Sequence, residues 1–219
     1  MSVLGLLKKV RNRLYDYTWK YQHERVRQNY IEKYHGNNPT IICCNCIGGI
    51  LYHELKLQFL SPTINLYMNC EDFIKFCENL EHYLSLEISP YNGNIERDYP
   101  LGLLDDLLIY FVHYKSLDDA KQKWESRKKR INWNNIYIIA TDRDGLTEDL
   151  LMRFLALPYV NKKIFTHFPM PEHHEVVYIK GYEEEKQIEG LMYKTIGGHY
   201  LIDQFDWVNW LNGNNGHRG

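Results

Sequence analysis

Two short polar segments carry most of the side chains in this chain that could do chemistry, and each follows an apolar, β-branched run. The first, residues 45–49, holds an amide, a thiol and a pair of glycines: Asn45, Cys46, Gly48 and Gly49. The second, residues 141–145, reads TDRDG and holds a hydroxyl and two carboxylates: Thr141, Asp142 and Asp144. In an open α/β sheet, ligands bind in the loops that leave the carboxyl ends of the strands. Both segments are therefore candidate parts of a binding site.

Cys46 is a candidate nucleophile because it stands where a loop enters a predicted helix. At such a position, free amide groups and the helix dipole stabilise a thiolate and are expected to lower its pKa. The Asn45 side chain is a candidate donor to an oxyanion. His113 is a candidate base, with Asp142 or Asp144 as its orienting carboxylate. This set predicts a Cys-nucleophile acyltransferase or hydrolase. The structural alternative is a cysteine that fills the core and an asparagine that shapes a turn.

A site for an anionic ligand is a second interpretation, and it rests on different residues. Gly48 and Gly49 leave backbone N–H groups open to a phosphate at a helix start. The basic run at residues 121–130 supplies positive charge, with Arg127 and Arg130 as candidate ligand contacts. The segment matches neither GxGxxG nor GxxxxGK, so neither a dinucleotide site nor a P-loop is indicated. The alternative is a solvated helix face whose cations complete the helix dipole.

The spacing of Asp142 and Asp144 is similar to the acidic pair that binds a divalent cation and a diphosphate in many sugar transferases. An Asp-rich turn before a helix capped by Thr147 accounts for the same residues. The cysteines within residues 43–46 lack a CxxC pair, and adjacent strand residues point to opposite faces. No metal site is therefore predicted, and the cofactor is left open.

The composition is typical of a soluble globular protein, with 25% charged and 44% hydrophobic residues in a chain of 219. Five cysteines are an odd number and do not suit a disulfide framework. Apolar stretches fall short of a bilayer span, and the first ten residues lack the apolar core of a secretory signal. A cytoplasmic location is expected.

Alternating apolar strands and amphipathic helices are the elements that must position the two polar segments. Strands are predicted from Thr40 and at residues 63–68, 104–114, 135–140, 162–166 and 176–179. Helices are predicted at residues 49–58, 71–84, 147–155 and 203–211 and after a Ser116 cap. This succession predicts an α/β fold, a three-layer Rossmann-like sandwich with a mainly parallel central sheet, as a single domain over residues 37–219. In the strand order 3-2-1-4-5, the strands at Thr40 and Asn135 are neighbours, and the polar segments face one crevice.

Residues 1–36 form a distinct basic arm with a net charge of +5, which leaves −7 for the rest of the chain. Apolar residues recur there at steps of four and three and predict an amphipathic helix: Val3, Leu7, Val10, Leu14, Tyr17 and Tyr21. This stripe is expected to pack on the domain or on a second subunit. The alternative is adsorption of residues 1–21 to an anionic membrane face at the inner membrane, helped by Trp19. The acidic remainder offers no broad basic surface, so nucleic acid is not an expected partner. The oligomeric state is left open.

Six motifs spread along the chain, together with the basic helix before RIN, identify a resemblance to a known family: NCIGG, SPTIN, DFIKFCENL, YPLGLLDD, HYKS and TDRDG. The chain resembles, over roughly residues 35–212, a bacterial domain family of unknown function whose members carry the label exopolysaccharide biosynthesis protein. The resemblance implies a Rossmann-like sandwich and a role in surface-polysaccharide assembly, and it brings no catalytic residues. We therefore predict a transferase for an activated or lipid-linked sugar precursor, with a sugar or nucleotide sugar as ligand. The alternatives are the Cys46 acyltransferase or hydrolase and a non-enzymatic binding or scaffold protein at the membrane.

Overall fold

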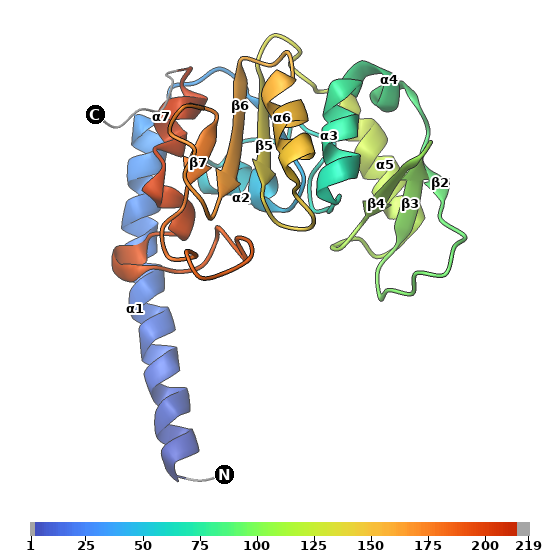
Figure 1. The fold of residues 1–219 in the computed structure, drawn as a ribbon. Coiled ribbons are helices and arrows are strands. Elements are labelled where there is room, and N and C mark those ends of the chain that lie inside the picture. The colour runs from blue at the N-terminus through green and yellow to red at the C-terminus, as the bar shows by residue number, and fades with distance from the viewer. Residues whose placement is uncertain (1–2, 214–219) are drawn as a thin grey trace.

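A parallel sheet forms the centre of the molecule (Figure 1). The structure, a computed structural model, describes residues 3–213, and the side chains of residues 1–11 and 13 lie outside the described set. Within that range, the sheet has four parallel strands in the order β1-β5-β6-β7: β1 (Thr40–Cys43), β5 (Ile136–Thr141), β6 (Asn161–Thr166) and β7 (Val176–Tyr178). The predicted α/β class and mainly parallel sheet are confirmed.

Successive side chains of the strands enter different cores, as the period of two in a strand requires. Ile42 and Ile138 pack with α3 (Cys70–Glu78), α5 (Leu117–Lys128) and α6 (Glu148–Ala156). Ile41 and Ile139 pack with α1 (Val3–Lys33), α2 (Ile47–Glu54) and α7 (Trp207–Leu211). Helices thus cover both faces of the sheet and give the three-layer sandwich.

Two predicted helix starts have the expected caps. The Ser116 hydroxyl accepts a hydrogen bond from the Asp119 amide at 3.1 Å, at the start of α5. The Thr147 hydroxyl accepts one from the Leu150 amide at 3.3 Å, at the start of α6. The helix predicted at residues 71–84 is interrupted at Asn79, whose φ of −132° is not helical, and it continues as α4 (Leu80–Ser85). The predicted C-terminal helix consists of η2 (Leu201–Gln204) followed by α7.

The strand predicted at residues 63–68 is absent from the described sheet, so the order 3-2-1-4-5 is wrong. Hydroxyl groups occupy the outer edge of β1, where that strand would have paired. The Ile41 amide donates to the Tyr52 hydroxyl at 2.9 Å, and the Cys43 amide donates to the Thr63 hydroxyl at 3.0 Å. Asn65, with a φ of 61°, breaks the extended run. The segment keeps one antiparallel bridge, between Tyr67 and Tyr110.

The run at residues 104–114 was predicted as a single strand, but it contains the turn and the second strand of a β-hairpin. In the described chain it contributes to a three-stranded antiparallel sheet of β2 (Ser89–Pro90), β3 (Leu101–Leu104) and β4 (Leu107–Tyr110). The turn consists of Asp105 and Asp106, and Asp105 takes a φ of 57°. Aspartate tolerates this conformation better than most residues, and two consecutive carboxylates favour the turn over a buried strand.

The C-terminal half of α1 packs on the domain, while its N-terminal half projects beyond it (Figure 1). Trp19, His23 and Tyr30 are buried. The predicted stripe is not the packing face, because Leu14, Tyr17 and Tyr21 are exposed. Val3, Leu7 and Val10 continue the stripe in the sequence, but their side chains lie outside the described set. No helix within residues 3–213 has both the length and the apolarity needed to cross a membrane.

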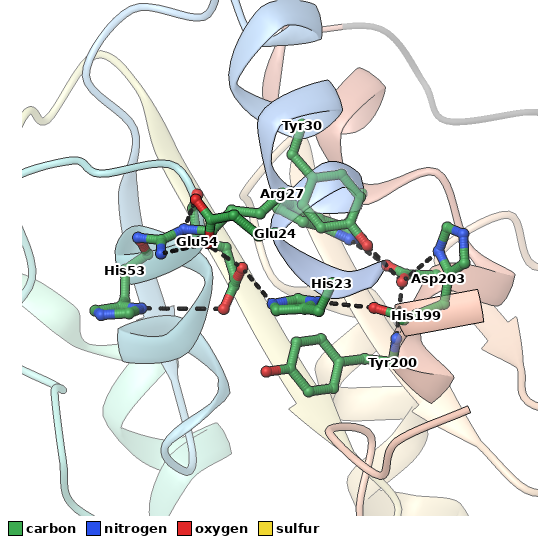
Figure 2. Close-up of polar contacts among 11 residues, drawn as sticks. His23, Glu24, Arg27, Tyr30, His53, Glu54, His199, Tyr200 and Asp203 are labelled. Carbon is green, nitrogen blue, oxygen red and sulfur yellow. Dashed lines mark hydrogen bonds and ion pairs between the residues drawn. The ribbon is translucent and has the colours of Figure 1, made fainter. Parts of the chain in front are cut away.

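A half-buried polar cluster fastens α1 to the domain (Figure 2). The His23 ring contacts the Gly198 carbonyl of η1 (Ile196–Gly198) through Nδ1 at 2.7 Å and the Glu54 carboxylate through Nε2 at 3.0 Å. The Asp203 carboxylate accepts hydrogen bonds from the Tyr30 hydroxyl and the Tyr200 amide. A Cβ on Gly198 would lie 2.4 Å from the His23 backbone nitrogen, so glycine permits the close approach.

Candidate functional site

A cavity of about 690 Å³ lies at the carboxyl ends of β1 and β5. Asn45 and Cys46 line it from the β1 side, and Thr141 and Asp144 line it from the β5 side. The structure therefore brings these four predicted residues together, as the parallel pairing of β1 and β5 requires. Tyr67 and the small antiparallel sheet with its β2–β3 loop form a third wall, and residues 188–193 form a fourth.

Asn45 shapes the turn into α2 as well as lining the cavity. Its Oδ1 accepts hydrogen bonds from the Ile47 amide at 3.0 Å and from the Cys43 thiol at 3.4 Å. Cys46 is the residue before α2 and is half-buried. Burial raises the pKa of the Cys46 thiol, and electrostatic repulsion from Cys44 adds a smaller increase. The predicted lowering of this pKa is wrong, because loss of water outweighs the helix start.

The exposed Arg143 and the half-buried Asp144 form an ion pair at the rim of the cavity. The Arg143 Nε lies 3.2 Å from the Asp144 carboxylate, and its Nη1 donates to the Glu189 carbonyl at 3.1 Å. Asp144 has a φ of 67°, and its amide donates to the Gln187 side chain at 3.0 Å. Burial and the nearby Asp144 carboxylate raise the pKa of Tyr67 above its usual range. The loop after β5 thus places a cation and an anion side by side.

Asp142 orients His167 rather than the predicted His113. Its buried carboxylate accepts hydrogen bonds from the His167 amide at 2.7 Å and from the Ile188 amide at 2.8 Å. The His167 Nδ1 lies 2.5 Å from the same carboxylate. Because Ile188 begins the wall formed by residues 188–193, the hydrogen bond from its amide to Asp142 holds the start of that wall in place.

Four tyrosines line the cavity together with aliphatic side chains. Tyr67 and Tyr110 exchange backbone hydrogen bonds of 2.8 and 2.9 Å, and their ring centroids lie 5.1 Å apart. Tyr99 and the exposed Tyr193 also line the cavity. Arg97, from the loop between β2 and β3, adds a second cation to the lining besides Arg143.

Gly48, Gly49 and His113 lie outside the cavity lining. A Cβ on Gly48 would meet the Cys43 side chain at 3.1 Å, and one on Gly49 would meet Ile64 at 3.3 Å. Both glycines therefore let α2 pack closely on β1 and the following segment. His113 is exposed on the loop after β4.

Arg127 and Arg130 also lie away from the cavity. Arg127 is buried, donates to the Tyr114 hydroxyl at 2.6 Å and stacks over Phe59. Arg130 donates to Ser126 and lines a hollow with residues that precede β1, at the opposite end of the strand. The geometry gives both arginines structural contacts.

Sequence reasoning missed the lining residues that come from distant parts of the chain, namely Tyr67, Tyr99, Tyr110, Arg97 and Tyr193. His167 directly follows a predicted strand, so the rule that identified residues 141–145 could have found it. Among the described residues, no group of three or more His, Cys, Asp or Glu side chains is arranged to hold a metal ion.

The fold and the cavity define a three-layer α/β protein with a ligand-sized cavity at the carboxyl edge of its parallel sheet. The chain belongs to the family described as Domain of unknown function (DUF1919), which matches residues 18–212. It is 40% identical over 174 residues to a Haemophilus influenzae protein described as an uncharacterized protein. This alignment covers 79% of this chain and 84% of that relative. Neither description assigns an activity, and the exopolysaccharide label has no support from them.

Proposed function

We propose that the cavity binds a sugar carried on a phosphate or diphosphate, and that the protein is a transferase acting on such a precursor of surface polysaccharide. The observation that carries the proposal is the combination of tyrosine rings, two arginines (Arg97 and Arg143) and two carboxylates (Asp144 and Glu189) around one cavity at the strand ends. Ring-bearing anions need both an apolar surface and a cation, and this cavity offers both.

The tyrosines suit the sugar ring. The C–H faces of a pyranose pack on aromatic rings, while phenol hydroxyls exchange hydrogen bonds with sugar hydroxyls. Mutual hydrogen bonds hold the backbones of Tyr67 and Tyr110, and their ring centroids lie 5.1 Å apart, so each ring packs against the other at the cavity wall. A cavity of about 690 Å³ is within the usual range for small-molecule sites.

The arginines suit the phosphate. A guanidinium binds phosphate oxygens through two parallel N–H donors, which fixes the orientation of the ligand. Arg143 has five N–H donors, and its contacts with Asp144 and Glu189 use two of them. Arg97 and Arg143 together would balance the charge of a departing phosphate.

Asp144 is the candidate base of the transfer. An acceptor hydroxyl attacks the anomeric carbon, and its proton passes to the Asp144 carboxylate. The bond between the anomeric carbon and the phosphate oxygen breaks, and the phosphate leaves with the bonding electrons beside the arginines. The left-handed backbone of Asp144, which aspartate tolerates, and the hydrogen bond from its amide to Gln187 fix the position of this residue in the loop.

Acyl transfer through Cys46 is the second candidate function, because its thiol lines the same cavity at the start of α2. Two observations weaken this candidate. Burial raises the pKa of the thiol, and the predicted base, His113, is not in the lining. The transferase proposal needs neither residue.

Thermal unfolding of the full chain with a panel of ligands tests the proposal. The panel contains UDP-, GDP- and CMP-linked sugars, the matching free sugars, inorganic phosphate and acyl-CoA thioesters. At least one nucleotide sugar should raise the melting temperature in a saturable way, since a ligand at 100 times its Kd adds about 2.7 kcal/mol of stability. The proposal fails if no nucleotide sugar stabilises the protein, and stabilisation by a thioester alone would favour acyl transfer.

A further inference from the structure

The outward face of α1 carries an apolar stripe that no part of the described chain covers. Leu14, Tyr17 and Tyr21 are 61%, 75% and 67% exposed. At about 100° per residue, these three side chains lie within an arc of about 60° on the helix. Single exposed apolar residues are ordinary, but an aligned set on a projecting helix is a contiguous surface.

This stripe lies opposite the face that holds α1 on the domain. Trp19, His23 and Tyr30 are the buried residues of the helix, and they lie about 180° around the helix from the stripe. The domain therefore covers one face of α1 and leaves the opposite face exposed. Trp19, which the sequence had suggested as a membrane contact, instead donates through Nε1 to the Thr195 carbonyl at 3.0 Å.

The sequence extends the stripe through Val3, Leu7 and Val10 at the same steps of four and three, with cations between them: Lys8, Lys9, Arg11, Arg13 and Lys20. Residues 1–21 carry a net charge of +4, against −6 for the rest of the chain. Their one acid, Asp16, is bound to Lys194 at 2.7 Å. The partner that complements this segment is apolar and anionic.

A second copy of the arm does not meet that requirement. Steps of four and three also describe the seam of a coiled coil, in which the flanking positions pair across the interface. Here those positions include Arg11, Arg13 and Lys20. Two such arms would oppose like charges on both sides of the seam, which disfavours self-association.

We propose that the outward stripe of α1 docks on an anionic lipid bilayer, with the helix lying along the surface. Apolar side chains and tyrosines enter the headgroup region, and the flanking cations contact lipid phosphates. Lys194 and Thr195, which contact Asp16 and Trp19, directly follow Tyr193 of the cavity. The wall formed by residues 188–193 therefore connects to the domain-facing side of α1, with the diameter of the helix, about 10 Å, between that side and the docked stripe. This inference stands without the proposed transferase activity.

Vesicle sedimentation of the full chain tests the docking. Vesicles of phosphatidylglycerol and phosphatidylcholine in equal parts are compared with vesicles of phosphatidylcholine alone. We expect binding to the anionic vesicles that weakens several-fold on addition of salt, roughly following charge screening. Leu14→Asp should weaken this binding about tenfold, because it removes apolar area and adds a repelled charge.

Val160→Asp is the matched control, since Val160 is 87% exposed and precedes β6, away from the arm. It introduces the same charge and should change vesicle binding less than about twofold. Two results overturn the proposal: no binding to anionic vesicles, or equal effects of the two substitutions. Sedimentation velocity identifies the other occupant, because a dimer that Leu14→Asp dissociates, without vesicle binding, would assign the stripe to a second copy.

Discussion

Asp142 and Asp144 belong to one short loop, but they have different structural roles because only Asp142 is fully buried. Asp142 is buried and accepts hydrogen bonds from His167 and Ile188, whereas Asp144 reaches the rim of the cavity. The TDRDG pattern gives both the same appearance, and its similarity to an acidic metal-binding pair depends on both carboxylates facing one point. The structure directs them to different partners.

Substitution of these two residues should separate stability from ligand handling. Asp142→Ala removes a buried acceptor of several hydrogen bonds and should lower the free energy of unfolding by about 3 kcal/mol. Asp144→Asn should lower it by less than about 1 kcal/mol, because the side chain is partly exposed, while reducing transferase turnover at least about tenfold. Urea unfolding and a turnover assay measure the two effects. Equal losses of stability in both variants would contradict the assignment.

The Cys46 thiol should react slowly. Because burial raises its pKa, less thiolate is present at a given pH than in an unstructured peptide. Labelling with a disulfide reagent across pH, with Cys46→Ser to identify the responding thiol, should give a rate below that of a simple thiol at pH 8. A faster rate would revive the nucleophile hypothesis. Cys46→Ser should leave nucleotide-sugar binding unchanged within about threefold.

Four lining residues were predictable at the residue scale because they directly follow apolar strands: Asn45, Cys46, Thr141 and Asp144. Tyr67 and Tyr110 were not, since a lone bridge between distant segments brings them together. Arg127 resembled a ligand contact in the sequence, but its guanidinium is buried against Tyr114 and Phe59. A basic run does not reveal which of its side chains a tertiary contact removes from the surface.

At the element scale, His23 holds α1 on the domain, and its two partners favour the charged form of the ring. Both nitrogens of His23 face acceptors, Gly198 O and the Glu54 carboxylate, and only an imidazolium can donate to both. Burial opposes the charge, but the bonds to Glu54 and Gly198 outweigh it, so the pKa of His23 lies above its ordinary value. Arg27, Tyr200 and Asp203 also lie near the ring or the Glu54 carboxylate (Figure 2).

The packing of α1 on the domain should therefore become less stable as the pH rises. A histidine whose pKa is raised on folding contributes stability that is fully present below its unfolded pKa of about 6.5 and is lost as pH passes the folded pKa. Thermal unfolding between pH 5.5 and 9 should show the wild-type stability falling across this window. His23→Gln should be less stable at pH 6, by about 2 kcal/mol, and should show a flatter profile. Parallel profiles for the two proteins would contradict a charged His23.

Local signals predicted elements best where the backbone depends on its own neighbours. The Ser116 and Thr147 caps lie at the expected helix starts because each hydroxyl bonds an amide three residues away. The run at residues 63–68 has strand-like composition, yet Thr63 and Tyr52 hydroxyls take the β1 amides that a strand would need. Amino-acid composition indicates that a segment tends to be extended. Which groups pair with the edge of a sheet is decided by tertiary contacts.

At the scale of the whole molecule, the crevice was predictable although the strand order was not. The crevice depends only on the parallel pairing of β1 with β5, which a β-α-β succession favours. Its outer wall is built by the long segment between those strands, including β3 and β4, which form a separate sheet. The same segment supplies Tyr67, Arg97 and Tyr110, so the proposed ligand class rests on the tertiary arrangement rather than on either polar segment alone.

Calorimetric titration with the most stabilising nucleotide sugar tests the central claim, that the cavity binds a phosphate-carried sugar through its arginines. Arg143→Gln should raise the Kd at least about tenfold, because it removes a guanidinium from the phosphate. Arg130→Gln, the matched loss of a cation at the opposite end of β1, should change the Kd less than about twofold. Equal Kd values for the wild type and Arg143→Gln, or the same loss in both variants, would contradict the claim.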